Sequence, residues 1–316
     1  MKISEILSAK DITISMEVFP PKTMDNYEKV ARAADAIASY QPDFMSITYG
    51  AGGGTSEHTL KIAEEIRRRE GVETLCHLTC VSSTQAKVHS QLARMQEMGL
   101  MNVMALRGDL PADGTAVLSD HYRHAVQLIE EIRQTGDFCI GGACYPEAHP
   151  ESPSRKEDLR HLKEKQDAGC DFFTTQMFFD NSAMYSFLYR AREAGITVPI
   201  VAGIMPLTSV KQVARSQAMS GTFFPARFRT MVDRYGGNPK AFAEAGIAYA
   251  TEQIADLIAN DVTHIHIYTM NHPKTAREIL NRLVYVLGRE VLGPVGPAAS
   301  GAGKTDPIGS SGIIHE

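Results

Sequence analysis

Short apolar runs rich in β-branched residues recur along the chain and alternate with longer stretches in which apolar residues have helical spacing. The short runs predict strands over residues 12–20, 43–50, 73–80, 102–109, 139–146, 172–179, 199–206 and 262–270. The longer stretches predict helices over residues 24–40, 55–70, 84–98, 120–135, 154–168, 182–194, 209–221 and 273–291, with further helix up to about residue 260. Nearly continuous apolar strands joined by helical crossovers indicate a parallel sheet covered by helices.

The repeated strand-and-helix unit predicts the fold. Eight such units in 316 residues are typical of an α/β fold of the (β/α)8 TIM-barrel type. A doubly wound open sheet is the alternative, because periodicity does not show whether a sheet closes. The long connection between strands 7 and 8 predicts extra helices there. We expect residues 1–292 to form a single barrel domain and residues 293–316, rich in Gly, Pro, Ala and Ser, to form a flexible C-terminal tail.

Composition and charge narrow the class of partner. The chain carries 32 Lys and Arg residues against 37 Asp and Glu residues, so it has no basic excess with which to neutralise nucleic-acid phosphates or a membrane surface. No segment approaches the roughly 18 uninterrupted apolar residues of a membrane span, and the N-terminus lacks a signal-peptide pattern, so a cytoplasmic protein is expected. The five cysteines are odd in number and lie in apolar runs, which is typical of reduced, buried thiols. Small molecules are therefore the expected partners.

Polar side chains stand at the ends of most predicted strands. In a (β/α)8 barrel the carboxyl ends of all strands meet at one rim, where the active site lies. The polar residues at these ends are Glu17, Thr48, Tyr49, His77, Thr79, Arg107, Asp109, Tyr145, His149, Gln176, Asn271 and His272. We therefore expect a ligand-binding pocket at this rim.

Two of the strand ends carry charges that suggest chemistry. Glu17 is the sole charge within residues 12–20, and apolar surroundings favour the protonated form of a carboxyl group, so Glu17 is a candidate general acid. The alternative is a structural carboxylate paired with a Lys or Arg of the barrel. Arg107 and Asp109 bracket Gly108 at the end of the fourth strand, where they either bind a ligand or pair with each other in a turn.

Histidines on two strands are open to more than one interpretation. His77 and Thr79 share one strand face and either contact a ligand or bond to each other. His264 and His266 share one face of the last strand, and we interpret them as core histidines or as supports for ligand-contacting residues, because no carboxylate partner is evident for a metal site. Lys165 lies in a helical charge run that is typical of a solvated face, although its side chain is long enough to reach a phosphate at the rim.

Eight segments follow one another in order at or near the predicted strand ends. They are Glu17-Val-Phe-Pro-Pro-Lys22, Thr48-Tyr-Gly-Ala51, His77-Leu-Thr-Cys80, Leu106-Arg-Gly-Asp109, Tyr145-Pro-Glu-Ala-His-Pro150, Thr175-Gln-Met-Phe-Phe-Asp180, Gly203-Ile-Met-Pro206 and Tyr268-Thr-Met-Asn271. Together they resemble the methylenetetrahydrofolate reductase family over about residues 12–290, in its bacterial form that consists of the catalytic barrel alone.

The resemblance implies a flavoprotein oxidoreductase of one-carbon metabolism and methionine biosynthesis. It would bind FAD and reduce 5,10-methylenetetrahydrofolate to 5-methyltetrahydrofolate, with hydride passing from NADH or NADPH through FAD in a ping-pong cycle. Glu17 would be the acid that opens the five-membered ring of the folate, and Asp109, the second catalytic residue, would lie beside the flavin and the pterin. Gln176 and Gln212 would bind the substrate together with Glu17.

The resemblance also implies a set of residues around FAD. They are Thr48, His77, Arg107, Gly108, Asp109, Tyr145, His149, Asp158 and Lys165, of which Arg107, His149 and Lys165 would face the diphosphate. Two departures concern the nucleotide donor and the tail of the substrate: Ser216 stands where relatives often carry an aromatic residue, and His272 where many carry an arginine.

Alternatives to the flavoprotein reductase stay open at this point. One is a flavin-free reductase of the same fold that takes hydride directly from a nicotinamide nucleotide. The other is a folate- or flavin-binding subunit that passes electrons to a partner within a larger complex. A homo-oligomer is expected in either case.

Overall fold

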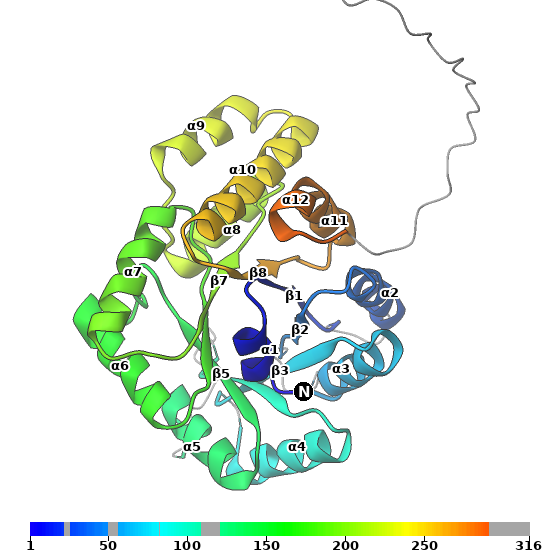
Figure 1. The fold of residues 1–316 in the computed structure, drawn as a ribbon, viewed down its shortest axis with the longest axis vertical. Coiled ribbons are helices and arrows are strands. Elements are labelled where there is room, and N and C mark those ends of the chain that lie inside the picture. Colours follow the sequence, from blue (N-terminus) through cyan, green and yellow to red (C-terminus); the bar gives the residue numbers. More distant parts are fainter. Residues whose placement is uncertain (22–25, 50–55, 82, 109–120, 291–316) are drawn as a thin grey trace, which may run out of the picture.

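The computed structural model describes residues 1–21, 26–49, 56–81, 83–108 and 121–290. Within these ranges, eight parallel strands form a closed barrel in which each strand pairs with the next and β1 pairs with β8 (Figure 1). The strands are β1 (Thr13–Val18), β2 (Phe44–Ile47), β3 (Glu73–Thr79), β4 (Asn102–Leu106), β5 (Cys139–Cys144), β6 (Phe172–Thr175), β7 (Ile200–Ile204) and β8 (His264–Tyr268). The predicted TIM barrel is confirmed, and the open sheet is excluded because β1 and β8 are bonded in register.

All helices except α1 lie around the outside of the barrel, and the helices account for most of the predicted helical stretches (Figure 1). They are α1 (Ile3–Ala9), α2 (Tyr27–Ala38), α3 (Ser56–Glu70), α4 (Gln85–Glu97), α5 (Ala125–Thr135), α6 (Arg155–Asp167), α7 (Asn181–Glu193), α8 (Val210–Ser220), α9 (Ala226–Tyr235), α10 (Pro239–Ala259), α11 (Pro273–Arg282) and α12 (Val284–Leu287). The helices α8, α9 and α10 lie between β7 and β8, which confirms the predicted extra helices. None of the described helices combines the length and the apolar character that a membrane crossing requires.

The inside of the barrel changes from apolar to polar along β2 and β3, where every second side chain of the strand points inward. In β2 the inward residues are Phe44, which packs in an apolar cluster, and then Ser46, which lines a cavity. In β3 they are Leu75 and then His77. In these two strands the amino end therefore packs in the apolar cluster, and the carboxyl end contributes a polar side chain to the cavity.

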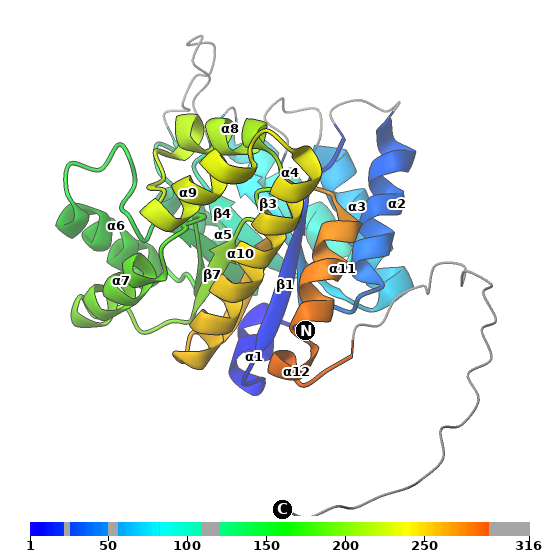
Figure 2. The same ribbon diagram turned by 90° about the horizontal axis from the view of Figure 1, so that it is seen from above.

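Helix α1 closes the apolar end of the barrel. It lies in the centre of the ring of strands in Figure 1 and at the end opposite α8 in Figure 2. Its Ile3, Ile6 and Leu7 are buried against inward residues of the strands, and the amide of Ile3 donates to Asn102 Oδ1 at 2.9 Å. The sequence pattern did not predict this helix, because seven residues are too few to display a helical period.

Two further expectations can be compared with the structure. All five cysteines are buried and free, as their apolar surroundings predicted. The predicted tail, residues 293–316, lies outside the described residues.

Candidate active site

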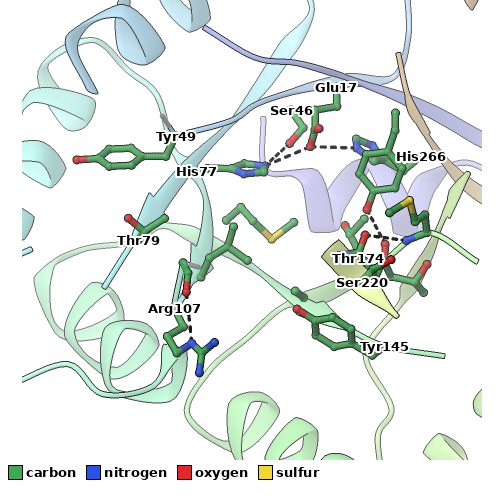
Figure 3. Close-up of a pocket in the computed structure, with 18 of the residues that line it drawn as sticks. Glu17, Ser46, Tyr49, His77, Thr79, Arg107, Tyr145, Thr174, Ser220 and His266 are labelled. Atoms are coloured by element: carbon green, nitrogen blue, oxygen red, sulfur yellow. Dashed lines mark hydrogen bonds and ion pairs between the residues drawn. The ribbon is translucent and has the colours of Figure 1, made fainter. Parts of the chain in front are cut away.

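A cavity of about 550 Å³ opens at the carboxyl ends of the strands (Figure 3). Every strand, or the loop directly after it, contributes at least one side chain to the lining. The lining includes many residues that the sequence predicted: Glu17, His77, Arg107, Gly108, Tyr145, His149, Lys165, Gln176 and Gln212. The topology of the barrel thus brings together side chains that are far apart in the sequence.

Glu17 lies between two histidines on the wall of the cavity (Figure 3). Its Oε2 is 4.0 Å from His77 Nε2 and 3.9 Å from His266 Nε2, and its side chain is 17% exposed. Among the ion pairs of the described residues, Glu17 occurs only with these two histidines. The alternative of a structural pair with Lys or Arg therefore has no support in this part of the chain.

His77 is a neutral side chain in this arrangement. Its Nε2 is 2.6 Å from Ser46 Oγ, which is the inward residue of the neighbouring strand. Burial lowers the pKa of His77 to about 4, although the nearby Glu17 carboxylate opposes the shift and His266 adds to it. The His77 ring therefore acts near neutral pH as a hydrogen-bonding group without charge.

The opposite wall of the cavity carries cations. Arg107 at the end of β4 forms a two-point ion pair with Glu151, with N–O distances of 2.5 and 2.8 Å, and this bond holds the pKa of the Glu151 carboxyl below its usual range. Lys165 of α6 donates to the carbonyl of Ala143, and burial lowers the pKa of Lys165. These two cations give this wall the chemistry that binds phosphate or carboxylate groups.

The loop after β5 places two aromatic rings at the edge of the cavity. Tyr145 and His149 contact each other edge to face with ring centroids 4.7 Å apart. The amide of His149 donates to Asp158 Oδ1 at 3.3 Å. Burial lowers the pKa of His149 and raises the pKa of Asp158. Asp158 therefore holds this loop from α6 and does not itself line the cavity.

Gly108 follows β4 in a conformation that favours glycine. Its φ is +86°, and a Cβ there would lie 3.3 Å from the Thr79 Cβ and 3.4 Å from the Val81 Cβ. Gly108 therefore has no side chain that would cover the backbone at the edge of the cavity. This allows a bound ligand to approach the backbone closely.

The two candidate substrate glutamines differ in their own bonding. Gln176 Oε1 accepts from the amide of Met177 at 3.0 Å. Gln212 Oε1 accepts from the amides of Thr208 and Ser209 at 2.8 and 3.0 Å, so it completes the capping box at the start of α8. In both cases the side-chain oxygen is bonded to nearby backbone, which fixes the position of the amide group.

Comparison with known proteins assigns the chain to a family. A family model described as methylenetetrahydrofolate reductase matches residues 2–284. The chain belongs to the methylenetetrahydrofolate reductase family. The ordered set of motifs at the strand ends predicted this membership.

Curated members of the methylenetetrahydrofolate reductase family resemble this chain over most of its length. The 5,10-methylenetetrahydrofolate reductase of Pectobacterium carotovorum subsp. carotovorum is 35% identical over 272 residues, which cover 86% of this chain and 90% of that protein. The protein of the same name from Escherichia coli (strain K12) is 33% identical with the same coverage. Methylenetetrahydrofolate reductase (NADH) 1 of Arabidopsis thaliana is 37% identical over 295 residues, 89% of this chain and 50% of that protein. The chain thus spans about half the length of this plant relative.

Solved structures share the fold at low sequence identity. An uncharacterized protein from Clostridium thermocellum, described as binding two copies of 5-methyl-5,6,7,8-tetrahydrofolic acid, has a TM-score of 0.64 at 13% identity and covers 91% of this chain and 99% of that chain. A 2,3-dimethylmalate lyase has a TM-score of 0.52 at 12% identity and covers 94% of this chain and 90% of that chain. At such identities the likeness concerns the barrel alone.

Some residues that the family resemblance implied lie away from the cavity or beyond the described chain. Thr48 does not line the cavity; its amide donates to Val18 O at 3.0 Å and so extends the pairing of β1 with β2. Asp109, the second predicted catalytic residue, lies outside the described residues. His272 occupies the N-cap position of α11 without a side-chain capping bond, whereas Ser216 lines the cavity and is only 5% exposed.

Inward residues of the strands were missed as members of the site. Ser46, His266 and Tyr268 line the cavity, and the Tyr268 hydroxyl donates to Thr175 O at 2.6 Å. His266 faces Glu17, so the carboxylate partner that the sequence did not reveal is on β1. Side chains alternate between the inside and the outside of the barrel along each strand. Counting back in steps of two from the polar residue at a strand end therefore identifies these inward residues.

Proposed function

We propose that the protein reduces 5,10-methylenetetrahydrofolate to 5-methyltetrahydrofolate, with FAD as its cofactor and NADH or NADPH as the electron donor. The observation that carries the proposal is the position of Glu17 on the cavity wall opposite Arg107 and Lys165. An acid that stands apart from the cations suits a reaction in which one ligand carries phosphates and another receives a proton. Relatives of similar length carry the name of this activity, and plant relatives carry it with NADH.

The residues of the cavity fit FAD. Its diphosphate requires cations and amides, which Arg107, Lys165 and the backbone at Gly108 would supply. The buried hydroxyl of Thr174, a residue of the cavity wall, has no hydrogen-bond partner among the described residues. When bound, FAD would accept hydride from the nicotinamide nucleotide and deliver it to the folate in a ping-pong sequence.

Glu17 would act on the folate. A proton given by Glu17 to the nitrogen that leaves the methylene carbon opens the five-membered ring of the substrate, and the carbon becomes an electrophilic iminium. Gln176 and Gln212 would bind the substrate through the amide groups that their backbone bonds hold in place. The role of Asp109 beside the reacting rings stays a prediction.

Substitution of the acid tests its assignment. We expect Glu17→Gln to leave reduction of the flavin by the nicotinamide nucleotide within about twofold and to slow reduction of methylenetetrahydrofolate by roughly 10²- to 10⁴-fold. Anaerobic stopped-flow measurement of the two half-reactions separates these effects. Glu73→Gln, at the other end of the barrel where Glu73 binds the N-terminal amine, is the matched control and should change neither half-reaction. Equal loss in both half-reactions of Glu17→Gln would contradict the acid role.

One experiment separates this function from its alternatives. The purified protein is mixed anaerobically with NADH or NADPH while the flavin absorbance is followed, and methylenetetrahydrofolate is then added. Bleaching by a nicotinamide nucleotide and recovery with the folate support the proposal. A colourless protein that turns over and does not take up FAD supports a flavin-free reductase. Bleaching only by a partner protein supports an electron-transfer subunit.

A further inference from the structure

The seam between β1 and β8 carries a column of polar side chains inside the barrel. The two strands pair in register, which sets Thr13 beside His264, Ser15 beside His266, and Glu17 beside Tyr268. In the first two pairs a hydroxyl contacts a histidine Nδ1: Thr13 Oγ1 lies 3.0 Å from His264, and Ser15 Oγ lies 2.8 Å from His266. The same contact thus occurs twice between these two strands, and the contact of Ser15 with His266 is the one next to Glu17.

The bonding of Ser15 determines which nitrogen of His266 carries the proton. The Ser15 hydroxyl donates to the carbonyl of Ile265 at 3.1 Å. A serine hydroxyl has one proton, so Ser15 Oγ can only accept from His266 Nδ1. We infer that His266 carries its proton on Nδ1, so that its Nε2 presents a lone pair to Glu17 Oε2 at 3.9 Å.

A lone pair that faces a carboxyl oxygen requires a proton between them. If Glu17 were ionised and His266 neutral, two electron-rich atoms would face each other, whereas one proton on either atom makes the contact favourable. His77, from β3, is the other titratable ring beside Glu17 and is neutral near pH 7 because burial lowers its pKa to about 4. The Tyr268 ring packs edge to face on His266 at 5.0 Å, and burial raises the pKa of its hydroxyl, so Tyr268 is neutral as well.

The spacing of these groups suits proton transfer. Among the described residues, no group of three or more His, Cys, Asp or Glu side chains is placed to hold a metal ion. A separation of 3.9 Å exceeds a direct hydrogen bond by about 1 Å, a gap that a small rotation of the Glu17 side chain closes. His266 is 2% exposed yet lines the cavity, so it contacts both the core and the ligand space.

We propose that His266 is a positioning residue that holds the proton of Glu17 and restores it after each turnover. The proposal rests on the proposed function, in which Glu17 gives its proton to a nitrogen of the folate. After that step, Nε2 of His266 takes up a solvent proton (H3O⁺, which leaves as water) and passes it to the Glu17 carboxylate, so that His266 returns to its neutral form. The bond from Nδ1 to Ser15 keeps the ring in the orientation that this transfer requires.

His266→Asn tests the role in turnover. The asparagine amide retains a donor near Nδ1 for Ser15 but has no atom in place of Nε2. The control is His264→Asn. His264 lies on the same strand and its Nδ1 also contacts a hydroxyl, that of Thr13. We expect His266→Asn to slow reduction of methylenetetrahydrofolate by about 10²-fold, with flavin reduction by the nicotinamide nucleotide within about twofold. We expect His264→Asn to keep both rates. Equal loss in both half-reactions, or the same loss in both variants, would overturn the proposal.

A second measurement on the full-length protein does not depend on folate turnover. Nitrogen chemical shifts of the imidazole rings in ¹⁵N-labelled protein report which nitrogen is protonated, and His266→Asn identifies the His266 signals. We expect the shifts of His266 to show a proton on Nδ1. In Glu17→Gln we expect the chemical shift of His266 Nε2 to change and the shifts of the His264 ring to stay the same. A neutral His266 ring protonated on Nε2, or a His266 Nε2 shift that is unchanged in Glu17→Gln, would refute a proton shared by Glu17 and His266. If the wild-type reduced flavin is not reoxidised by methylenetetrahydrofolate, the proposed function fails, and these shifts still decide whether Glu17 and His266 share a proton.

Discussion

The neutral, buried state of His77 predicts how the stability of the protein depends on pH. Its side chain is 11% exposed, and burial is the main reason that its pKa falls to about 4. The perturbation is a change from pH 7 to pH 5, over which an unperturbed histidine becomes charged and His77 in the folded protein does not.

The sign and the size of the effect follow from proton binding by the two states. The unfolded chain takes up a proton on this ring near pH 6.5, and the folded protein only near pH 4, so below pH 6.5 the unfolded state binds more protons. The contribution of His77 to stability is therefore present at pH 7 and is lost as the pH falls. The loss is about 2 kcal/mol between pH 7 and pH 5 and approaches about 3 kcal/mol below pH 4.

Urea unfolding of the wild type and of His77→Gln at both pH values measures this contribution. The wild type should lose about 2 kcal/mol more than His77→Gln between pH 7 and pH 5, because the glutamine does not titrate. The variant removes only the His77 part of the pH dependence, so other titrating groups cancel in the comparison. Equal losses in the two proteins, or a His77 ring that titrates near pH 6.5 by NMR, would refute the reasoning.

Two further substitutions test the packing around the site and at the closed end of the barrel. In Gly203→Ala the new Cβ would lie 2.4 Å from Thr175 O and 2.7 Å from Tyr268 Cε2. We therefore expect the free energy of unfolding, measured with urea, to fall by about 1–3 kcal/mol. A variant as stable as the wild type would show that the strand ends shift to accommodate the methyl group at no cost. Asn102→Ala removes the acceptor for the Ile3 amide that anchors α1. It should cost about 1–3 kcal/mol and speed hydrogen exchange in α1 while both half-reactions are kept; slow exchange there would contradict the anchoring role.

Apolar patterning predicted the barrel because its strands are buried on both faces and interrupted by helices of regular length. The predicted ends of the strands were less accurate where apolar residues continue from the strand into a loop. The sixth predicted strand ran to Phe179, whereas β6 ends at Thr175. Met177 and Phe179 pack instead in a cluster with Phe224 near α9, so their apolar character reflects loop packing. Sequence periodicity does not distinguish these two reasons for burial.

The rim of the barrel was predicted more completely than the wall below it. Glu17, Arg107 and Gln176 were identifiable because each ends an apolar run and the topology joins those ends. His266 was not recognised as a partner of Glu17, because their relation depends on the closure of β1 on β8. Asp158, which the resemblance implied as a cofactor residue, accepts from the His149 amide in the loop after β5, a contact that no spacing along the chain reveals.

The division between strands and helices bears on the two departures that the family resemblance implied. Glu17 and His266 are on β1 and β8, and their positions are fixed by register pairing and by the bond to Ser15. The two residues at which the resemblance implied a departure, Ser216 on α8 and His272 at the start of α11, lie outside the strands. A change on a helix can alter the contacts of a nucleotide or a substrate tail while Glu17, the proposed acid, keeps its geometry. We therefore expect the departures to affect KM for the two substrates more than the rate of proton transfer.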